Sequence, residues 1–307
     1  MTAGWVAPTT RGRALLARTI GADGAREIAS APSWDEARRR LAATAYGNGL
    51  APAADRMMAR RRAGEIVAWQ LRVLSGWLPP ATGDLVRLAV GPFEIGDVDA
   101  HLAHLAGAEP VDPMPLGALG TIGRRVARTR TPGEVRQVLS RSGWGDPGVD
   151  DPAAIACSMR ITWTRRIARA GGPTGSWGLG AAATLLARER FVADREIAGP
   201  AEHDLARLLG HGALAAATLE ELVDRLATRA RWPFESVRGP GELWRSELAV
   251  LARVDRDARE LSTTTASRGT VVAVIARLLV DMWRVTAAID AAGRGSVGVE
   301  VLDAVAA

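Results

Sequence analysis

Two histidines and two acidic residues of this 307-residue chain are spaced so that they could bind a metal ion. His101 and His104 are three residues apart, Asp97 precedes His101 by about one helical turn, and Glu94 lies a turn earlier. Side chains at such spacings share one helical face, and carboxylate and imidazole groups are common metal ligands. Helical di-metal sites, however, need a Glu-x-x-His pair from each of two helices, and no such pair occurs elsewhere in the chain. A packed or solvent-facing histidine pair is the favoured interpretation. His203 and His211 are eight residues apart and form no pattern.

Other segments with a chemical precedent are incomplete. Gly171 to Gly180 contains five glycines but lacks the Gly-Lys-Ser/Thr ending of a phosphate-binding loop, so a flexible loop is predicted. Asp150-Asp151 is followed by Ala154 where a magnesium-binding, aspartate-rich motif would carry another acid. Cys157 is the only cysteine and lysine is absent, so the usual nucleophiles and bases are scarce. We therefore predict no catalytic, cofactor-binding or metal-binding residue, no cofactor, and a protein that is not an enzyme.

The basic residues are all arginines, 39 of them, and the net charge is +5. A basic patch that binds nucleic acid is one interpretation. A solvated helical surface with interspersed acids is favoured, because the excess of positive charge is small. Two clusters, Arg38 to Arg40 and Arg60 to Arg62, are the best candidates for contact with an anionic partner.

The helices that would position these residues are predicted from a sequence pattern that occurs three times. A hydroxyl residue stands three positions before a glutamate and eight before a leucine, and an aromatic residue follows at offset 13 or 14. A hydroxyl and a glutamate at this spacing form a capping box at a helix start. The three copies are Ser33/Glu36/Leu41/Tyr46, Thr131/Glu134/Leu139/Trp144 and Thr218/Glu221/Leu226/Trp232.

A second pattern recurs after each helix start. Its copies are Glu94 to Val98, Asp194 to Ile197 and Asp281 to Val285, and each begins at nearly the same distance after its own hydroxyl residue. The middle copy matches only by position. The two patterns together predict one domain over residues 1–307, built from three similar units at about 14–107, 116–199 and 200–295.

Composition favours an all-α fold, since alanine and leucine dominate and no run of alternating β-branched residues occurs. Long helices are predicted over Asp55 to Ser75, Pro152 to Ala170 and Val271 to Ile289, with another over Asp97 to Leu105. The helix from Val271 carries Arg277, Asp281 and Arg284, which would be costly in lipid, so it is predicted to be a core helix rather than a membrane span. Ser262 to Gly269 is predicted as its polar entrance and Gly293 to Gly298 as a loose tail.

Tryptophan is abundant, with ten residues. Six of them lie in or beside apolar helical segments and are predicted to fill the core, although one or two could anchor a partner, because tryptophan is enriched at interfaces. The six are Trp34, Trp69, Trp77, Trp144, Trp163 and Trp283.

The repeated patterns resemble the C-type subunits of the archaeal and bacterial V/A-type ATPases, which are the d-type subunits of the vacuolar enzyme. Residues Ser33 to Tyr46 fit the family pattern Ser-x-x-Glu-Ala-x-x-x-Leu-x-x-Thr-x-Tyr throughout. Phe93 to Val98 is similar to the later Asp-Val-x-Asn-Ile helix, with Glu94 for the acid and Asp97 for the asparagine. Arg284 departs from that pattern in the third unit, and most of the family's tyrosines are absent.

The resemblance implies a non-catalytic coupling protein within a rotary ATPase. Family members form a funnel of three similar helical subdomains around a pseudo-threefold axis. The funnel lies on the membrane rotor ring, receives the lower end of the central stalk and passes torque between ATP turnover and proton or sodium transport. The implied location is the cytoplasmic face of the cell membrane, peripheral to it, with rotor-ring and central-stalk subunits and the membrane surface as partners. The alternatives are a basic all-α nucleic-acid-binding protein and a diverged helical scaffold. No secretion signal is recognised at residues 1–13.

Overall fold

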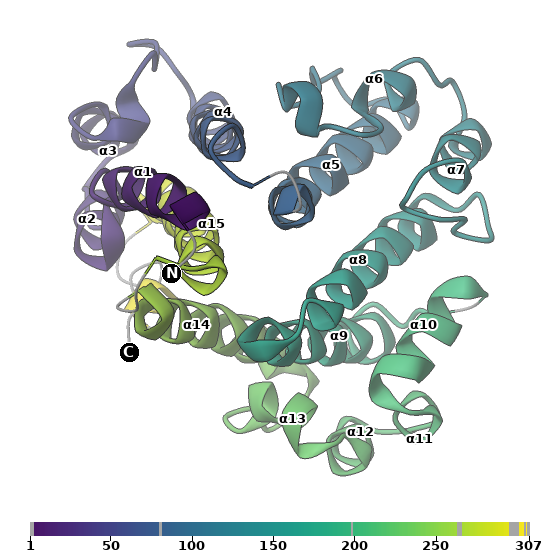
Figure 1. The fold of residues 1–307 in the computed structure, drawn as a ribbon. Coiled ribbons are helices and arrows are strands. Elements are labelled where there is room, and N and C mark those ends of the chain that lie inside the picture. Colours follow the sequence, from purple (N-terminus) through teal and green to yellow (C-terminus); the bar gives the residue numbers. More distant parts are fainter. Residues whose placement is uncertain are drawn as a thin grey trace. The chain divides into compact units, whose positions relative to one another are not determined.

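The computed structural model describes residues 3–79, 82–197, 199–262, 266–294, 301–303 and 305. Within these ranges every regular element is a helix and none is a strand, so the predicted all-α class is confirmed (Figure 1). The predicted tail and polar entrance extend into residues outside the described ranges, as does the end of the third predicted unit at residue 295. The boundaries of the three units stay a prediction.

Long helices alternate with groups of short ones. The α-helices are α1 (Val6–Leu16), α2 (Gly21–Ala29), α3 (Trp34–Ala42), α4 (Arg56–Ser75), α5 (Gly83–Leu105), α6 (Gly123–Val126), α7 (Pro132–Ser140), α8 (Pro152–Arg169), α9 (Gly172–Phe191), α10 (Pro200–Leu209), α11 (His211–Leu214), α12 (Leu219–Arg225), α13 (Thr228–Arg231), α14 (Leu243–Ser262) and α15 (Arg268–Ala291). Short 3-10 turns are η1 (Ala3–Trp5), η2 (Ala45–Gly47), η4 (Gly117–Leu119), η5 (Trp232–Phe234) and η6 (Pro240–Glu242).

The three predicted helix starts are confirmed at α3, α7 and α12. The side-chain oxygens of Ser33, Thr131 and Thr218 accept hydrogen bonds from the amides three residues later, at 3.3, 3.2 and 3.1 Å. Such a cap satisfies one of the amides that a helix start leaves without a backbone partner. The leucine of each copy is buried: Leu41, Leu139 and Leu226 are exposed by 1% or less.

The glutamates of these caps only partly follow the capping-box geometry. The Glu134 carboxylate accepts the amide of Arg130, and the Glu221 carboxylate accepts the amide of Ala217, one residue before the cap in each case. Glu36 instead accepts hydrogen bonds from the arginines that follow it on α3. The three copies are therefore most alike at the hydroxyl cap and the buried leucine, and they differ in the contacts of the glutamate.

The described chain forms two compact units, one made of residues 1–90, 115–119 and 251–307 and the other of residues 91–114 and 120–250. In the first unit, α15 packs against α1, α2 and α4. Val274, Leu278 and Ile289 of α15 are fully buried, which confirms the predicted core helix. α1 approaches α15 closely, since a Cβ added to Gly12 would lie 2.8 Å from the Val274 side chain. No helix in the described residues is both long enough and apolar enough to cross a membrane.

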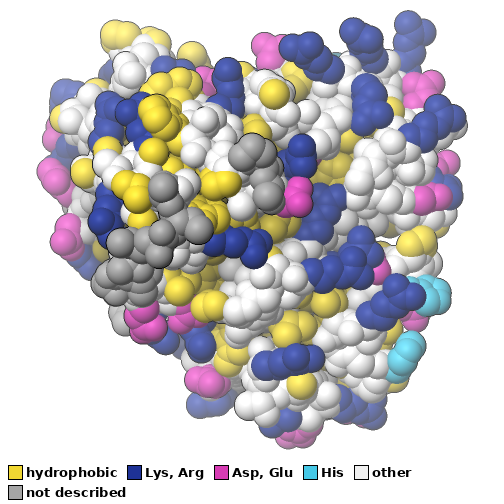
Figure 2. Space-filling model, viewed as in Figure 1, with side chains coloured by type: hydrophobic (Ala, Val, Ile, Leu, Met, Phe, Trp, Pro, Cys, Tyr) yellow, Lys and Arg dark blue, Asp and Glu magenta, His cyan; other side chains and the backbone are white. Residues whose placement is uncertain are grey.

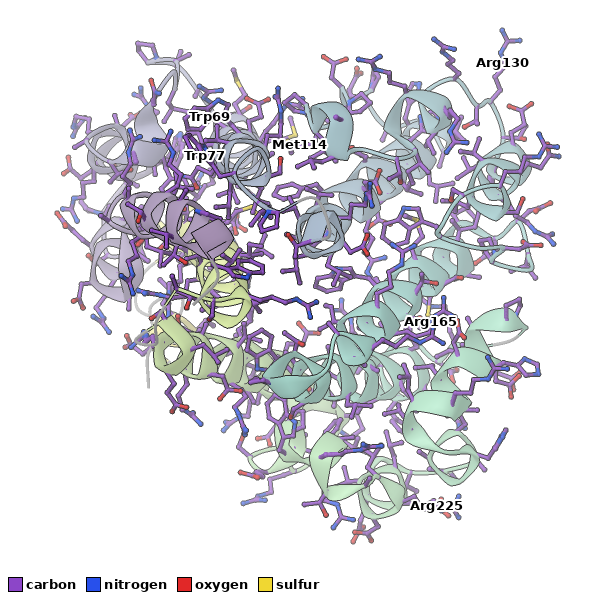
Figure 3. The ribbon with its side chains drawn as sticks, in the orientation of Figure 1. Trp69, Trp77, Met114, Arg130, Arg165 and Arg225 are labelled. Atoms are coloured by element: carbon purple, nitrogen blue, oxygen red, sulfur yellow. The ribbon has the colours of Figure 1, made fainter. Side chains whose placement is uncertain are left out.

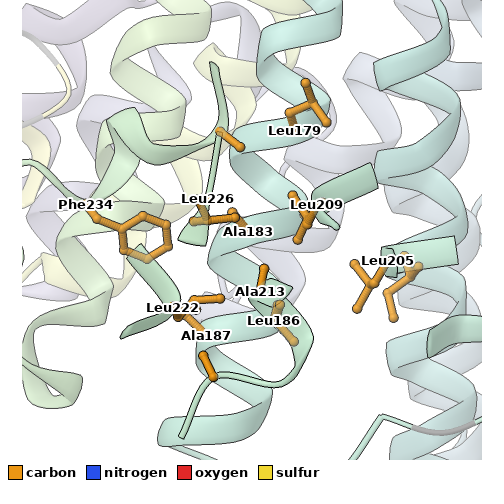
Figure 4. Close-up of a cluster of buried hydrophobic side chains, with 14 of the residues drawn as sticks. Leu179, Ala183, Leu186, Ala187, Leu205, Leu209, Ala213, Leu222, Leu226 and Phe234 are labelled. Atoms are coloured by element: carbon orange, nitrogen blue, oxygen red, sulfur yellow. The ribbon is translucent and has the colours of Figure 1, made fainter. Parts of the chain in front are cut away.

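The second unit is built around the pair α8 and α9, against which α10 and α13 also pack. Its larger apolar cluster joins α9 to the short helices that follow it, through residues such as Leu186, Leu205, Leu222 and Phe234 (Figure 4). A smaller cluster joins α5 to α7 and α8 through Val98, Val135, Ile155 and others. The third capped helix, α12, is thus held by apolar packing on α9.

The predicted flexible loop at Gly171 to Gly180 is wrong, because residues 172–191 form α9. Gly171 and Gly172 have positive φ, and a proline follows in the first helical turn, where its missing N–H is tolerated. Gly178 lets α9 lie against α8, since a Cβ there would overlap the Ala168 backbone. Gly178 is therefore a packing residue on a helix, whereas Gly171 and Gly172 form the start of α9.

The helix predicted over Asp97 to Leu105 is the second half of α5, which begins at Gly83 and continues through Pro92. A proline disfavours helical conformation in the preceding residue through contact with its Cβ. Gly91 has no Cβ, and its bare surface lies against Trp163, where a Cβ would be 2.5 Å from the indole Cδ1. Gly91 therefore removes one of the contacts by which Pro92 would disfavour the helix, and it lets Trp163 lie against α5.

The prediction for the six tryptophans is only partly right. Trp144 is buried and three others are half-buried. Trp69 and Trp77 are exposed by 47% and 53%, so these two do not fill the core.

Candidate functional site

The residues of α5 that were weighed as a metal-binding face make contacts within the chain. Asp97 accepts the amide of Met114 at 2.9 Å, and His101 Nε2 lies 2.8 Å from the Thr129 hydroxyl. His104 Nδ1 lies 2.9 Å from a backbone carbonyl four residues later. In the described part of the chain, no group of three or more His, Cys, Asp or Glu side chains is arranged to hold a metal. His203 and His211 are both exposed.

Glu94 is buried, with 3% exposure, and its carboxylate is the centre of a dense polar cluster. It accepts hydrogen bonds from the amide and the hydroxyl of Thr121, from the Ile122 amide at 3.0 Å, and from the Trp144 indole Nε1 at 2.9 Å. Ile122 is the N-cap of α6, so its amide is one that a helix start leaves free, and the Thr121 amide directly precedes it. The cluster fastens α6 and the turn after α7 to the long helix α5.

Asp281 on α15 has the same kind of surroundings and is 2% exposed. Its carboxylate accepts the amides of Ile20 at 3.2 Å and Gly21 at 2.8 Å, together with the Tyr46 hydroxyl at 2.7 Å. Ile20 is the N-cap of α2, and Tyr46 lies in η2, just after α3. Segments from near the two ends of the sequence therefore meet at one carboxylate.

Burial dominates the electrostatics of this second cluster. It raises the pKa of Asp281, while hydrogen bonds from Tyr46 and from the two amides act in the opposite direction. The pKa of Tyr46 is raised by burial and by the negative charge of Asp281. The tyrosine hydroxyl is thus kept protonated as a donor to the carboxylate.

We call each cluster a carboxylate joint: the Glu94 joint and the Asp281 joint. Each contains a buried acid on a long helix, two consecutive amides at the start of a short helix, and the aromatic donor that ends a copy of the first sequence pattern. The Glu94 joint lies wholly in one compact unit and the Asp281 joint wholly in the other. The two acids are those of the first and third copies of the second sequence pattern.

The middle copy of the second pattern does not form such a joint. Asp194 is exposed, lies after the end of α9 and has a φ of 49°, so it follows the helix rather than lying within it. The buried acid nearby is Glu189, 6% exposed, and its carboxylate pairs with Arg195 Nε at 2.8 Å. The middle copy of the pattern thus marks an exposed position after α9, and the buried acid lies five residues earlier.

The third aromatic residue, Trp232, is half-buried in η5 and packs on α9. A Cβ on Gly180 would overlap its indole ring, so the glycine makes room for it. α9 therefore receives the third copy of the motif, as α5 receives the second and α15 the first, although by apolar packing.

The two predicted arginine clusters are balanced by acids. Each of their six guanidinium groups lies within 3.3 Å of a carboxylate: Arg38–Asp35, Arg39–Glu36, Arg40–Glu36, Arg60–Asp290, Arg61–Glu65 and Arg62–Glu65. Such exposed pairs contribute little stability, but they leave the clusters close to neutral.

A run of arginines that the sequence analysis missed lies on α6 and the turn after it. Arg124, Arg125, Arg128 and Arg130 are all exposed, and none forms an ion pair with another residue that the structure describes. Figure 2 shows dark-blue side chains gathered at the upper right, where Figure 1 places α6 and α7, and Figure 3 labels Arg130 there. The signal in the sequence is the lack of an acid between residues 113 and 133.

A cavity of about 350 Å³ lies between the start of α8 and the end of α9. Its lining includes Cys157, Asp151, Glu189 and Arg195. Burial, with the nearby charge of Glu189, raises the pKa of the Cys157 thiol to about 12. A thiol with so high a pKa is a poor nucleophile at neutral pH, and Asp151 is engaged as the N-cap of α8. These residues give no arrangement for catalysis.

The sequence matches no known protein-family model and has no significant match among the curated proteins.

Proposed function

We propose that this chain is a non-catalytic central-stalk subunit of a V/A-type rotary ATPase. In this role it couples the central stalk to the membrane rotor ring for proton or sodium transport. The proposal includes the finer architecture of that family, three similar helical subdomains around a pseudo-threefold axis in a funnel. It also includes a peripheral position at the cytoplasmic face of the membrane.

The observation that supports the proposal is that aromatic residues of the first sequence pattern donate hydrogen bonds to acids of the second. Tyr46 ends the first copy of the first pattern, and its hydroxyl donates to Asp281, the acid of the third copy of the second pattern. Trp144 ends the second copy of the first pattern, and its indole donates to Glu94, the acid of the first copy of the second. The two patterns on which the resemblance to the family rests are thus in direct contact, which gives a structural reason for their occurrence in the same chain.

A coupling protein needs stiffness, and the joints supply it. A buried carboxylate that loses its donors costs several kcal/mol, so the short helices are held at defined positions on the long ones. Each joint combines directional hydrogen bonds from backbone amides with one from a rigid ring. This use of buried charge fits a part that transmits force and makes large contacts with its neighbours.

The test is assembly with the rotor-ring and central-stalk subunits of the same organism. We expect the purified chain to form a stoichiometric complex with the stalk and to join it to the ring. In a reconstituted enzyme, omission of the chain should abolish ATP-driven ion transport while the catalytic head still hydrolyses ATP. A folded, monodisperse chain that binds neither ring nor stalk would contradict the proposal.

Nucleic-acid binding is the second candidate, and the arginine run on α6 is the observation that favours it. If Arg124, Arg125, Arg128 and Arg130 contact four phosphates, the logarithm of the affinity for duplex DNA should fall with the logarithm of salt with a slope of roughly −3 to −4. Replacing these four by glutamine should abolish that binding, whereas replacing the ion-paired residues Arg38 to Arg40 should not. Absence of binding at low salt removes this candidate.

A further inference from the structure

One compact unit, residues 1–90, 115–119 and 251–307, concentrates its exposed apolar side chains in one region. Its described residues expose five large hydrophobic side chains, and all five lie on α1, on α4 or just after α4. They are Val6 (50%), Met57 (69%), Met58 (51%), Trp69 (47%) and Trp77 (53%). Figure 2 shows yellow side chains gathered at the upper left, where α1 and α4 lie, and Figure 3 labels both tryptophans beside α4.

The five residues belong to two helices that pack against each other, α1 and α4, or directly follow α4. Met58 and Trp69 are eleven residues apart, which places them on the same face of α4. The start of α1 meets the chain that leaves α4, since a Cβ on Gly4 would lie 3.6 Å from the Pro79 ring. We call the region formed by these five residues the α1–α4 surface.

Exposed arginines lie on the same two helices. α1 carries the exposed residues Arg11 and Arg13 and no acid, and Arg72 is exposed on α4, one turn from Trp69. The other arginines of α4 are engaged within the chain: Arg60, Arg61 and Arg62 pair with acids, and Arg56 donates to the backbone carbonyls of Ile289 and Ala292. The positive charge beside the apolar side chains is therefore that of Arg11, Arg13 and Arg72.

We propose that the α1–α4 surface docks directly on an anionic phospholipid bilayer. Tryptophan side chains favour the headgroup level of a membrane, and nearby arginines are attracted to anionic lipids. Val6 and the two methionines would enter the boundary of the acyl chains, which nucleic acid cannot offer them. The surface also needs no rearrangement, because these side chains are exposed already.

This inference deepens the proposed function, on which it rests for its biological setting. It names lipid as a direct partner beside the rotor ring. Vesicle binding needs no other part of the ATPase, so the two proposals can fail separately.

The test is co-sedimentation of the full chain with vesicles of phosphatidylcholine alone or mixed with phosphatidylglycerol. We expect binding only to the anionic vesicles, weakened by salt. The double variant Trp69→Ser/Trp77→Ser should lower the affinity at least about tenfold, because burial of two half-exposed indoles is lost. The matched control is Trp244→Ser, since Trp244 is 48% exposed but lies in the other unit. Its affinity should equal that of the wild type, and all variants should keep the wild-type melting temperature.

Three results would overturn the inference: no binding to anionic vesicles, equal binding to both kinds of vesicle, or an equal loss in the Trp244→Ser control. If the wild type ignores vesicles and the double variant fails to join the ring or stalk, the α1–α4 surface belongs to a protein partner and the lipid proposal is wrong. If vesicle binding fails while assembly of every variant is normal, the coupling function stands without a lipid contact.

Discussion

Tyr46→Phe isolates the hydrogen bond that closes the Asp281 joint. The ring is 2% exposed and phenylalanine keeps its volume, so the change removes only the hydroxyl, which donates to the carboxylate at 2.7 Å. A buried hydrogen bond to a charged group is worth about 1.5–3 kcal/mol. We expect the free energy of unfolding to fall by that amount, measured by urea denaturation with circular dichroism.

The effect of Tyr46→Phe on stability should also depend on pH, in a direction set by the pKa of Asp281. Burial raises the pKa of Asp281, so the folded protein holds its proton more tightly than the unfolded chain does. Stability from this group is therefore present at low pH and declines as pH rises from the ordinary aspartate pKa of about 4 through the raised value. The Tyr46 hydrogen bond favours the ionised carboxylate and so lowers the folded-state pKa of Asp281. Its loss in Tyr46→Phe raises that pKa further, so the penalty of the substitution should grow as pH rises above the folded-state pKa of the wild type. Asp281→Asn should lose this pH dependence, because asparagine does not titrate.

A double-mutant cycle between Tyr46→Phe and Asp281→Asn completes the test. We expect a coupling energy above about 1 kcal/mol at neutral pH, since the two residues are in direct contact. Asp23→Asn is the control for the loss of a carboxylate, because the Asp23 side chain is fully exposed and should contribute no such coupling. A coupling energy below about 0.5 kcal/mol, which is the range of independent sites, would refute the joint as described. So would a Tyr46→Phe penalty that does not change with pH.

Three further predictions concern the second unit. Gly178→Ala should destabilise the fold by about 1–3 kcal/mol, because its Cβ would overlap the Ala168 backbone. The control is Gly96→Ala, which has nothing within 4 Å of its Cβ and should stabilise α5 by about 0.5–1 kcal/mol. Equal effects of the two variants in urea denaturation would contradict the packing of α8 on α9. Cys157 should react with a thiol reagent at pH 8 only after denaturation, since its pKa is raised to about 12; rapid labelling of the native protein would show that the thiol is accessible and ionised. Thr131→Ala should cost about 0.5–2 kcal/mol through loss of the cap on α7, with Thr131→Ser as the control that retains it.

Local features of the fold could be read from the sequence. The caps at Ser33, Thr131 and Thr218 and the burial of the leucines eight residues later depend on one helix and its immediate contacts. α4 likewise begins after an aspartate cap, Asp55, and ends at Ser75, as its pattern predicts. Helix periodicity and capping act over a few residues, so a single sequence contains the information.

The joints could not be read in the same way. The partner of Tyr46 is 235 residues away, and nothing in local periodicity pairs a tyrosine near one end of the chain with an acid near the other. Asp281 and Arg284 were recognised as charges in an apolar helix, yet both are buried and hydrogen-bonded, Arg284 to Asp255 at 2.7 Å. A buried charge of this kind becomes interpretable only when its donors are known.

The roles of the glycines on α9 and of the two arginine clusters could not be predicted from the sequence, for a common reason. Gly178 and Gly180 suggest local flexibility, but their lack of a side chain serves contacts with α8 and with Trp232. The triplets at Arg38 and Arg60 stand out as charge runs, but acids three or four residues away, or on another helix, balance them. In both cases the role of a residue is decided by a partner that tertiary structure brings to it.

The order in which the motifs meet their long helices bears on the proposed architecture. α5 receives the motif that follows it along the chain, through Glu94 and Trp144, and α9 receives the next, through Gly180 and Trp232. The first motif has no long helix before it, and α15, the last long helix, receives it instead. In a linear array of repeats, no long helix would precede the first motif, so that motif would lack such a contact or make it with another kind of element. Each copy of the motif thus contacts one long helix within its own compact unit, and the first copy contacts the last long helix of the chain.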